Sequence, residues 1–307
     1  MKALIRGVIK WFLLGPFRAV VPLLPASVIY VMGRIGGMLY CTVAKARGEI
    51  IERNLEKLMG SGRVDAKEVV RRSFVNYIMS EFEVFLYKRL GSSNIGRFVE
   101  AEGLEYLDDA LKLKKGVVLL HAHFGNEHML MPGLGHRGYR INQVGLASED
   151  AVANIEKVLN RKSDGLMMSW FRLKGECEKY LPANFIFLNN QMRAALKVLD
   201  KNEILAISMD GMGQNMTEVR FFNIDAEFMT GPVRIALMAG SPIVPVFMVR
   251  KKNGRHRLVI EPPLSNIKTV EDGVKAFAAL LEDYMRRYPC HYARLLGYGQ
   301  PPFGKLN

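Results

Sequence analysis

From about residue 97 onward, short runs typical of buried strands alternate with longer segments of helical periodicity. This alternation is the pattern of an α/β fold, in which helices pack on the faces of a central sheet. We therefore predict a central mixed sheet flanked by helices. The expected strands are 97–102, 116–120, 141–145, 184–188, 203–208, 217–222, 242–250 and 255–261. The expected helices are 103–113, 126–134, 150–161, 192–200, 231–238 and 270–288.

The first forty-odd residues are strongly apolar, but basic residues and prolines interrupt the run repeatedly. The longest uncharged stretch, residues 19–33, has about fifteen residues, whereas a membrane-spanning helix needs about twenty. In residues 1–14, Arg6 and Lys10 lie four positions apart beside Trp11. This pattern is typical of an amphipathic helix that lies in the headgroup region of a membrane.

Two other interpretations of this segment stay open, namely ordinary helices that cover the core and one membrane-spanning helix. A signal peptide fits less well, because the apolar run continues and no convincing cleavage site follows the basic start. Residues 44–90 continue with helical spacing, and a second long helix is expected to begin at Asp65. We therefore expect a membrane-associating helical layer, residues 1–45, and one α/β domain, residues 46–307.

The formal charge of +13 attracts polyanions, among which nucleic acid and an anionic membrane are common. The aromatic residues do not interleave with basic ones as a nucleic-acid stacking surface requires, and no zinc-finger spacing is present. We therefore expect a membrane surface, and no nucleic acid, as partner. Three distant cysteines, Cys41, Cys177 and Cys290, argue against a disulfide framework and for a reducing compartment.

The residues with the clearest chemical meaning follow the apolar run 117–120, where His121 and His123 end a strand and Gly125 turns the chain. Catalytic groups often lie at such strand-to-helix corners, outside the carboxyl end of a sheet. His123 would lie at the open end of the strand. Glu127, four residues on, can accept an imidazole N–H and stabilise the imidazolium that forms when the histidine takes a proton.

This stretch also allows plainer interpretations. A histidine after a strand is commonly only a polar loop residue, and the group His121, His123 and His128 could instead bind a metal, since imidazole is a common ligand. No cysteine and no second acidic cluster at ligand spacing supports a metal, so we expect none. Asn126 is expected to cap the helix that follows.

Asp210 follows another buried run and could approach the same end of the sheet. It could orient His123 or a phosphate-bearing group, although an Asp-Gly pair is also an ordinary turn. Later in the chain, Thr230 or Gly231 could cap a helix whose free N–H groups bind an anion, with Arg234 adding a positive charge. A lipid phosphate or the phosphopantetheine of a carrier would suit such a site.

The stretch 239–247 reads as an extended apolar strand that carries Pro242 and Pro245. Proline cannot donate to a ladder of backbone hydrogen bonds, so we expect this strand near an edge of the sheet or an entrance.

Taken in order, these stretches resemble the lysophospholipid acyltransferase superfamily. The most similar branch is the bacterial one with the late lipid A acyltransferases and the phosphatidylinositol mannoside acyltransferases. The resemblance runs from about residue 22 to residue 288. It is carried by Arg53-Asn54-Leu55, Glu102-Gly103-Leu104, His123-Phe-Gly-Asn126, Asp210-Gly211, Phe221-Phe222, Gly231 and Pro242-Ile-Val-Pro245-Val-Phe247.

The resemblance implies an O-acyltransferase at the cytoplasmic face of the inner membrane, held there as a peripheral or monotopic protein. It would move a fatty acyl group from an acyl-carrier protein or coenzyme A thioester to a hydroxyl of a membrane glycolipid or lysophospholipid. No cofactor beyond this co-substrate is implied. His123 is implied to be the base. The residues that we expect to contact substrate are His121, Asn126, His128, Arg220, Gly231 and Arg234.

The sequence departs from the pattern of the branch at one position. The branch usually places an acid five residues after the base, where this chain has His128, and the acid Glu127 comes one residue early. On a helix that shift is a rotation of about 100°. Either the local turn still lets Glu127 meet His123, or Asp210 supplies the carboxylate, or activity is lost or altered. A non-catalytic lipid-binding protein of the same fold and a metal-dependent hydrolase therefore stay open as alternatives.

Overall fold

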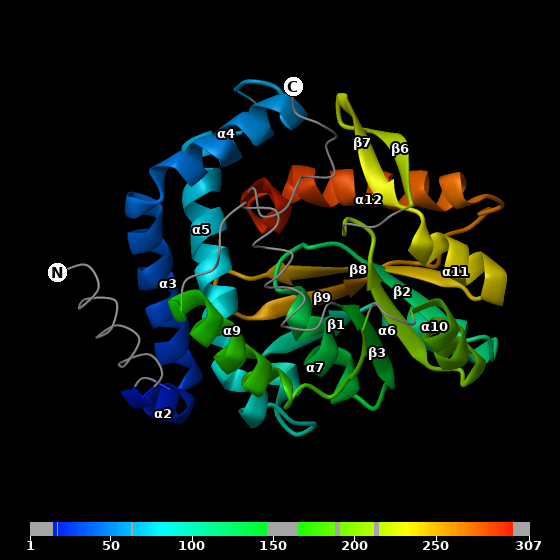
Figure 1. Cartoon of the computed structure of the whole chain (residues 1–307), viewed down its shortest axis with the longest axis horizontal. Coiled ribbons are helices and arrows are strands. Elements are labelled where there is room, and N and C mark those ends of the chain that lie inside the picture. The colour runs from blue at the N-terminus through cyan, green and yellow to red at the C-terminus, as the bar shows by residue number, and fades with distance from the viewer. Residues whose placement is uncertain are drawn as a thin grey trace.

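The computed structural model describes residues 15–16, 18–62, 64–145, 165–187, 191–211 and 215–296. A seven-stranded sheet with the order β1-β9-β8-β2-β5-β3-β4 forms its centre (Figure 1). Strands β8, β2, β5, β3 and β4 run parallel, whereas β9 pairs antiparallel with β8 and parallel with β1. The predicted mixed α/β sheet is therefore confirmed. Its strands are β1 (Val99–Glu102), β2 (Val117–His121), β3 (Ile141–Gly145), β4 (Asn184–Phe187), β5 (Ile204–Ser208), β8 (Ile243–Arg250) and β9 (His256–Ile260).

Side chains of the buried strand β2 alternate between two hydrophobic clusters, one on each face of the sheet. Val118 and Leu120 join the cluster that includes α11 and α12, while Val117 and Leu119 join the cluster that includes α6 and α7. A strand covered on both faces is apolar throughout, which explains the unbroken run in the sequence. Figure 1 shows α12 and α6 on opposite sides of the sheet. The helices over the sheet are α6 (Leu104–Lys112), α7 (Leu130–Gly135), α10 (Gln191–Asp200), α11 (Gly231–Ala239) and α12 (Val270–Arg287).

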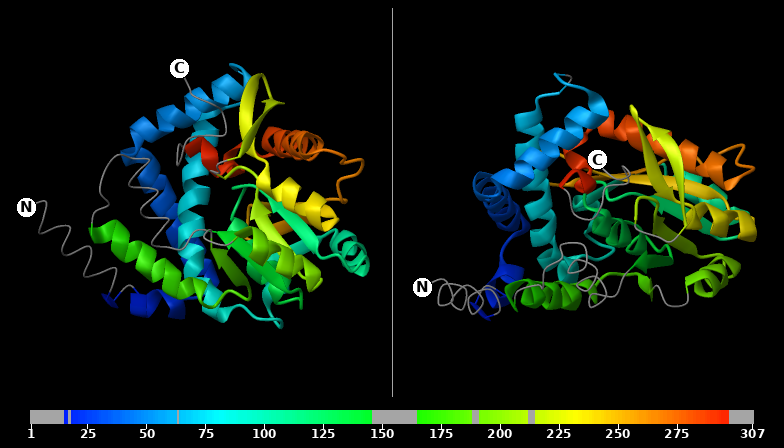
Figure 2. Two further views of the ribbon diagram at one scale, coloured as in Figure 1. Left: turned by 45° about the vertical axis from the view of Figure 1, so that its right-hand side comes forward. Right: turned by 45° about the horizontal axis from the view of Figure 1, so that its top comes forward.

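A helical layer precedes the sheet in the chain, and its helices α3 and α5 lie side by side (Figure 2). Glycines allow this close approach, because a Cβ added at Gly37 would lie 2.5 Å from the Cα of Val75. Helix α9 packs against the 3₁₀ segment Val84–Arg89, which follows α5. These elements are α2 (Arg18–Val20), α3 (Ala26–Val43), α4 (Lys45–Met59), α5 (Ala66–Glu83) and α9 (Gly165–Glu178).

Helix α3 is long and apolar enough to cross a membrane, judged by its length and composition alone. Only 17% of its apolar window is buried, because one face packs on α5 and the other faces outward. Val31, Ile35, Leu39 and Val43 follow one another at intervals of four and are between 48% and 77% exposed. Residues four apart share a face of a helix, so α3 carries an outward apolar stripe.

Several expected elements differ from the structure. The helix expected from residue 126 begins instead as a 3₁₀ turn, Glu127–Met129, before α7. The strand Ile224–Met229 (β7), which forms a separate antiparallel hairpin with Met216–Phe221 (β6), was not predicted. Its alternating buried Ala226 and Phe228 were the signal for it. The expected helices in residues 1–14 and 150–161 lie outside the described residues.

Of the two places predicted for the proline-bearing strand, near an edge of the sheet or near an entrance, the first is wrong. β8 is an interior strand, between β2 and β9, and all its residues are buried. Pro245 is the last residue that β8 pairs with β2, and the pairing with β9 begins at the next residue, Val246. The proline thus stands where one ladder ends and the other begins, a place that a residue without a backbone N–H can occupy.

Candidate active site

The pairing of β2 with β5 places the residues that follow these two strands side by side, at the carboxyl ends of the parallel strands. His121 pairs with Ser208, and the Met209 amide donates to the His121 carbonyl over 2.8 Å. Parallel neighbours present their carboxyl ends together, so His123 and Asp210 meet two residues beyond the strands. The backbone amide of His123 lies 3.1 Å and 3.0 Å from the two carboxylate oxygens of Asp210, and its ring Nδ1 lies 2.8 Å from Oδ1.

This contact settles how the imidazole of His123 is used. A carboxylate at hydrogen-bond distance accepts a proton, so Nδ1 carries the hydrogen and donates it to Asp210. Nε2 then holds the lone pair, as a general base requires. Asp210 is buried, which raises the pKa of its carboxyl, but His123 and Arg294 lower it more, so Asp210 is ionised at neutral pH. Burial lowers the pKa of His123, Asp210 and Glu127 raise it, and the net direction is upward.

Glu127 lies on the other side of the His123 ring. Its Oε1 is 3.7 Å from Nε2 of His123, and its Oε2 is 3.5 Å from Nδ1 of His121. Gln143 lies 3.1 Å from the remaining ring nitrogen of His121. Burial raises the pKa of the Glu127 carboxyl, but His123 and His121 outweigh burial and lower it to about 2. His123 is therefore placed between two ionised carboxylates.

The early position of Glu127 does not keep it from His123, because residues 123–126 are not helical. The rotation of about 100° per residue applies only along a regular helix. Gly125 shapes this loop: its φ is +68°, and an added Cβ would lie 1.9 Å from the carbonyl oxygen of Met248. His128, which occupies the usual place of the acid, lies instead 3.9 Å from Glu178 of α9. Burial and Lys174 lower the pKa of His128.

The prediction that Asn126 caps a helix is wrong. It occupies the position before the 3₁₀ turn, but its side chain makes no capping hydrogen bond there. Its Nδ2 donates instead to Oε2 of the fully buried Glu83 over 2.5 Å. Glu83 also accepts hydrogen bonds from Arg250 and His256. A buried carboxylate needs such donors, and leaving it short of one costs more free energy than losing a helix cap.

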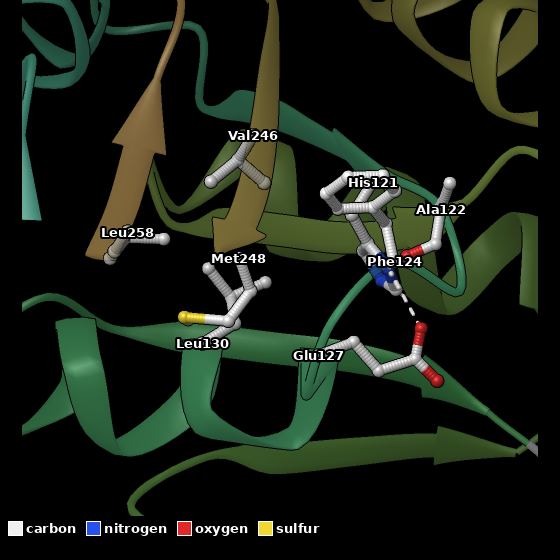
Figure 3. Close-up of a pocket in the computed structure, with 8 residues that line it drawn as sticks. All are labelled: His121, Ala122, Phe124, Glu127, Leu130, Val246, Met248 and Leu258. Carbon is white, nitrogen blue, oxygen red and sulfur yellow. Dashed lines mark hydrogen bonds and ion pairs between the residues drawn. The ribbon is translucent and has the colours of Figure 1, made fainter. Parts of the chain in front are cut away.

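A small, mostly apolar hollow lies beside the pair His121 and Glu127 (Figure 3). Leu130, Val246 and Met248 contribute its apolar wall, and the contact between Glu127 and His121 lies at its polar end. A concave apolar surface with few polar groups at one end is the general form of a site for an apolar ligand.

The candidate substrate-binding residues between positions 220 and 234 differ in their distance from the site. Gly231 begins α11 beside the site, because the Met229 amide donates to the Met209 carbonyl over 3.0 Å. Thr230 precedes the helix without capping it, since its hydroxyl donates to the Asn215 carbonyl.

The two arginines of that stretch lie apart from the imidazole. Arg234 is exposed on α11. Arg220 is also exposed and pairs with Asp225 across the β6–β7 hairpin over 3.4 Å. Within the described part of the chain, no three His, Cys, Asp or Glu side chains come together as a metal site.

The sequence reasoning missed two residues that contact Asp210. Arg294 lies with Nη2 3.4 Å from Nδ1 of His123 and with Nε 3.7 Å from Oδ2 of Asp210. Tyr292 is buried, and the negative charge of Asp210 contributes to raising its pKa. Both lie more than eighty positions from Asp210 in a segment without strand or helix periodicity, so no local sequence pattern predicted their contact with Asp210.

Comparison with known proteins gives a consistent result. The model of a family described as bacterial lipid A biosynthesis acyltransferase matches residues 2–297. The chain is 26% identical over 261 residues to the lipid A biosynthesis lauroyltransferase of Escherichia coli K12, covering 83% of this chain and 78% of that protein. It is 23% identical over 291 residues to the lipid A biosynthesis palmitoleoyltransferase of the same organism, covering 92% and 88%. The lipid A biosynthesis acyltransferase of Shigella flexneri matches to the same extent.

Proposed function

Because the chain belongs to the bacterial lipid A biosynthesis acyltransferase family, we propose that it transfers a fatty acyl group from an acyl thioester to a hydroxyl of lipid A or of a lipid A precursor. The chain is an O-acyltransferase, as its family and its similarity to a lauroyltransferase and a palmitoleoyltransferase indicate. The identity of the acceptor lipid and of the thioester, an acyl-carrier protein or coenzyme A derivative, belongs to the proposal.

One observation carries the proposed chemistry: His123 donates Nδ1–H to Asp210, which leaves the lone pair on Nε2 of a partly exposed ring. The side chain of His123 is 33% exposed, whereas that of Asp210 is fully buried. In the proposed reaction, Nε2 takes the proton of the acceptor hydroxyl, and the oxygen attacks the thioester carbonyl. The C–S bond then breaks, and the leaving thiolate takes the proton back from His123.

The two carboxylates would have different roles in this reaction. Asp210 fixes the tautomer and the orientation of the ring, the part that a carboxylate behind a catalytic histidine plays in general. Glu127 lies on the Nε2 side, from which the hydroxyl approaches, and its negative charge stabilises the imidazolium while the proton resides on His123. No covalent acyl-enzyme is needed in this scheme.

The membrane would hold the acceptor and the protein together. We assign the contact to the outward apolar stripe of α3, which stands next to further exposed apolar residues at Val20 and Leu23. A helix that packs one face on the protein and exposes an apolar face suits the acyl–headgroup boundary, as a peripheral or monotopic enzyme requires. The charge of +13 favours an anionic cytoplasmic leaflet and an acidic carrier protein.

Substrate phosphate would bind near the start of α11. The first amides of that helix have no intrahelical partners, although Pro232 offers no N–H, and the hydrogen bond from Met229 to Met209 brings the start of the helix close to Asp210. Arg234 adds a positive charge one turn on. His121 and His128 would line the acceptor side with Glu127, whereas Asn126 and Arg220 would act at a distance from the reacting atoms.

The test is lipid mass spectrometry on cells that make lipid A and express the wild-type chain, His123→Ala, Asp210→Asn or Glu127→Ala. We expect an added acyl chain with the wild type, none with His123→Ala, and a strongly reduced amount with Asp210→Asn. Acylation that persists in His123→Ala overturns the proposed base. An unchanged lipid profile with the wild type, together with binding of lipid A by purified protein, would favour the non-catalytic lipid-binding protein.

A further inference from the structure

The last described segment of the chain returns to the candidate active site and pairs with the loop that carries His123. The Ala293 amide donates to the His123 carbonyl, and the Gly125 amide donates to the His291 carbonyl, each over 2.8 Å. Phe124 and Tyr292 face each other in an antiparallel bridge between these two turns. The segment consists of two 3₁₀ turns, Pro289–His291 and Ala293–Leu296.

The helical layer holds this segment in place. Asn54 of α4 donates its Nδ2 to the Leu295 carbonyl over 3.2 Å, and Asn76 of α5 donates to the Cys290 carbonyl over 3.0 Å. Both amides reach across more than two hundred positions of sequence. The position of the segment is thus fixed by hydrogen bonds on two sides, from the helices and from the His123 loop.

Arg294 is the charged residue that this arrangement brings to the site. Its side chain is only 10% exposed, and it lies 3.7 Å from Asp210 and 3.4 Å from Nδ1 of His123. Because Nδ1 donates its hydrogen to Asp210, the guanidinium and the imidazole present two donors to each other. Donors do not bind each other, and their repulsion grows when His123 gains a positive charge.

The charged groups around His123 therefore act in opposite directions. Asp210, behind β5, and Glu127, in the 3₁₀ turn, both favour the imidazolium, while Arg294 disfavours it. Tyr292 is neutral, since burial raises the pKa of its hydroxyl. Without Arg294 the two carboxylates would favour the protonated form of His123 more strongly, and a protonated histidine cannot accept the proton of a hydroxyl.

We propose that Arg294 is a positioning residue of acyl transfer, which the C-terminal segment holds beside Asp210 and His123 so that the imidazole is less readily protonated and more of it remains able to act as a base. The proposal rests on the proposed function, in which His123 is the base. It assigns a catalytic purpose to a segment that the sequence motifs do not include. The same guanidinium keeps Asp210 ionised, so one cation serves both members of the pair.

The test compares purified full-length wild type, Arg294→Gln, Arg294→Lys and Lys275→Gln, each assayed with an acyl thioester and a lipid A acceptor from about pH 5 to about pH 9. Lys275→Gln removes one positive charge from the exposed surface of α12, where Lys275 pairs with Glu271, and serves as the matched control. Arg294→Lys keeps the charge and measures what the guanidinium shape adds.

We expect the acidic limb of kcat/KM in Arg294→Gln to move up by about one pH unit, so that activity below the limb falls about tenfold and largely returns above it. Arg294→Lys and Lys275→Gln should keep the wild-type limb. A uniform loss at every pH in Arg294→Gln, with the limb unmoved, would show a purely structural role and overturn the inference.

A second readout does not depend on activity. The ring signals of His123 in a nuclear magnetic resonance titration, assigned with His123→Ala, report its protonation directly. We expect the midpoint of His123 to rise in Arg294→Gln and to stay near the wild-type value in Arg294→Lys and Lys275→Gln. An unchanged midpoint in Arg294→Gln overturns the inference even where no acyl transfer is found, whereas a wild type without transfer overturns the proposed function alone.

Discussion

Two clusters built from a carboxylate, a histidine and an arginine lie in this fold, and they differ in their access to solvent. In the first, Glu83 binds Nε2 of His256 at 2.9 Å and Nη1 of Arg250 at 2.5 Å, and the side chains of all three are at most 4% exposed. The second consists of Asp210, His123 and Arg294. Asp210 is as deeply buried as Glu83, but the side chain of His123 is 33% exposed.

The comparison teaches that the second ring nitrogen decides what such a cluster can do. His256 gives Nε2–H to Glu83, and burial lowers its pKa, so it stays neutral with its other nitrogen inside the protein. His123 gives Nδ1–H to its carboxylate, so Nε2 keeps the lone pair, and the side chain is partly exposed. The first cluster joins α5 to β8 and β9, whereas in the proposed function the second takes a proton from the acceptor hydroxyl.

The largest expected effect concerns activity at the second cluster. His123→Ala should lower kcat for acyl transfer by about 10²–10⁴-fold, the usual contribution of general base catalysis. The unfolding temperature should fall moderately, because buried Asp210 loses its side-chain partner but keeps the backbone amide of residue 123 and Arg294. Steady-state kinetics and calorimetry measure the two effects, and His136→Ala, at the residue that follows α7, controls for the loss of a partly buried histidine elsewhere. A wild-type kcat in His123→Ala would contradict a catalytic role for the second cluster, and the two clusters would then not differ in function.

At the first cluster the expected effect is on stability. Glu83→Gln leaves Arg250 buried without a negative partner and should cost about 3–5 kcal/mol of unfolding free energy. Denaturant unfolding measures it. The matched control is Glu100→Gln, which removes the exposed partner of Lys251 and should leave the unfolding midpoint unchanged. A loss of activity in Glu83→Gln without loss of stability would contradict a purely clamping role.

The acid dependence of stability sharpens the same contrast. The pKa of Glu83 is lowered from 4.5 to about 2: burial raises it, but Arg250 and His256 outweigh burial. A carboxyl with a lower pKa in the folded state binds fewer protons there than in the unfolded chain. Its stabilising effect is complete above the unfolded pKa and is lost as the pH falls toward the folded value.

Wild type should therefore lose stability between pH 4.5 and about 2, and Glu83→Gln should show a shallower slope in that window. Unfolding midpoints measured along the pH scale test this. Equal slopes in the two proteins would mean that Glu83 does not titrate in the window. Glu127, whose pKa is also lowered to about 2, contributes a slope of its own that Glu83→Gln leaves intact.

The smallest expected effect concerns Glu127. Because its charge raises the pKa of His123, Glu127→Gln should move the acidic limb of kcat/KM to lower pH, the direction opposite to that of Arg294→Gln. Activity above the limb should fall by about tenfold or less, since Asp210 still orients the ring. The pH profile of kcat/KM measures both. A limb that moves upward would show that Glu127 does not stabilise the imidazolium.

The resemblance and the local sequence patterns were sufficient to predict the strands that carry the site and the residues at their ends. The apolar runs of β2 and β5 predicted buried strands, and Asp210 was expected to be able to approach the same end of the sheet as His123. The order of strands in a sheet is not a local property, so the interior place of β8 was missed. The early position of Glu127 was judged as if the loop were a helix, and a backbone with Gly125 at positive φ made that premise wrong.

The sequence by itself determined the α/β class, the buried strands and the histidines at the end of one of them, because the hydrophobic period and the residues at strand ends depend on a few neighbours. Only the tertiary structure decided which nitrogen of His123 meets which carboxylate, and that a cation lies behind the pair. Arg294 is 171 positions from His123, and it reaches the ring because Asn54 and Asn76 anchor the segment that carries it. Such contacts depend on how distant segments pack, and a one-dimensional pattern carries no record of that.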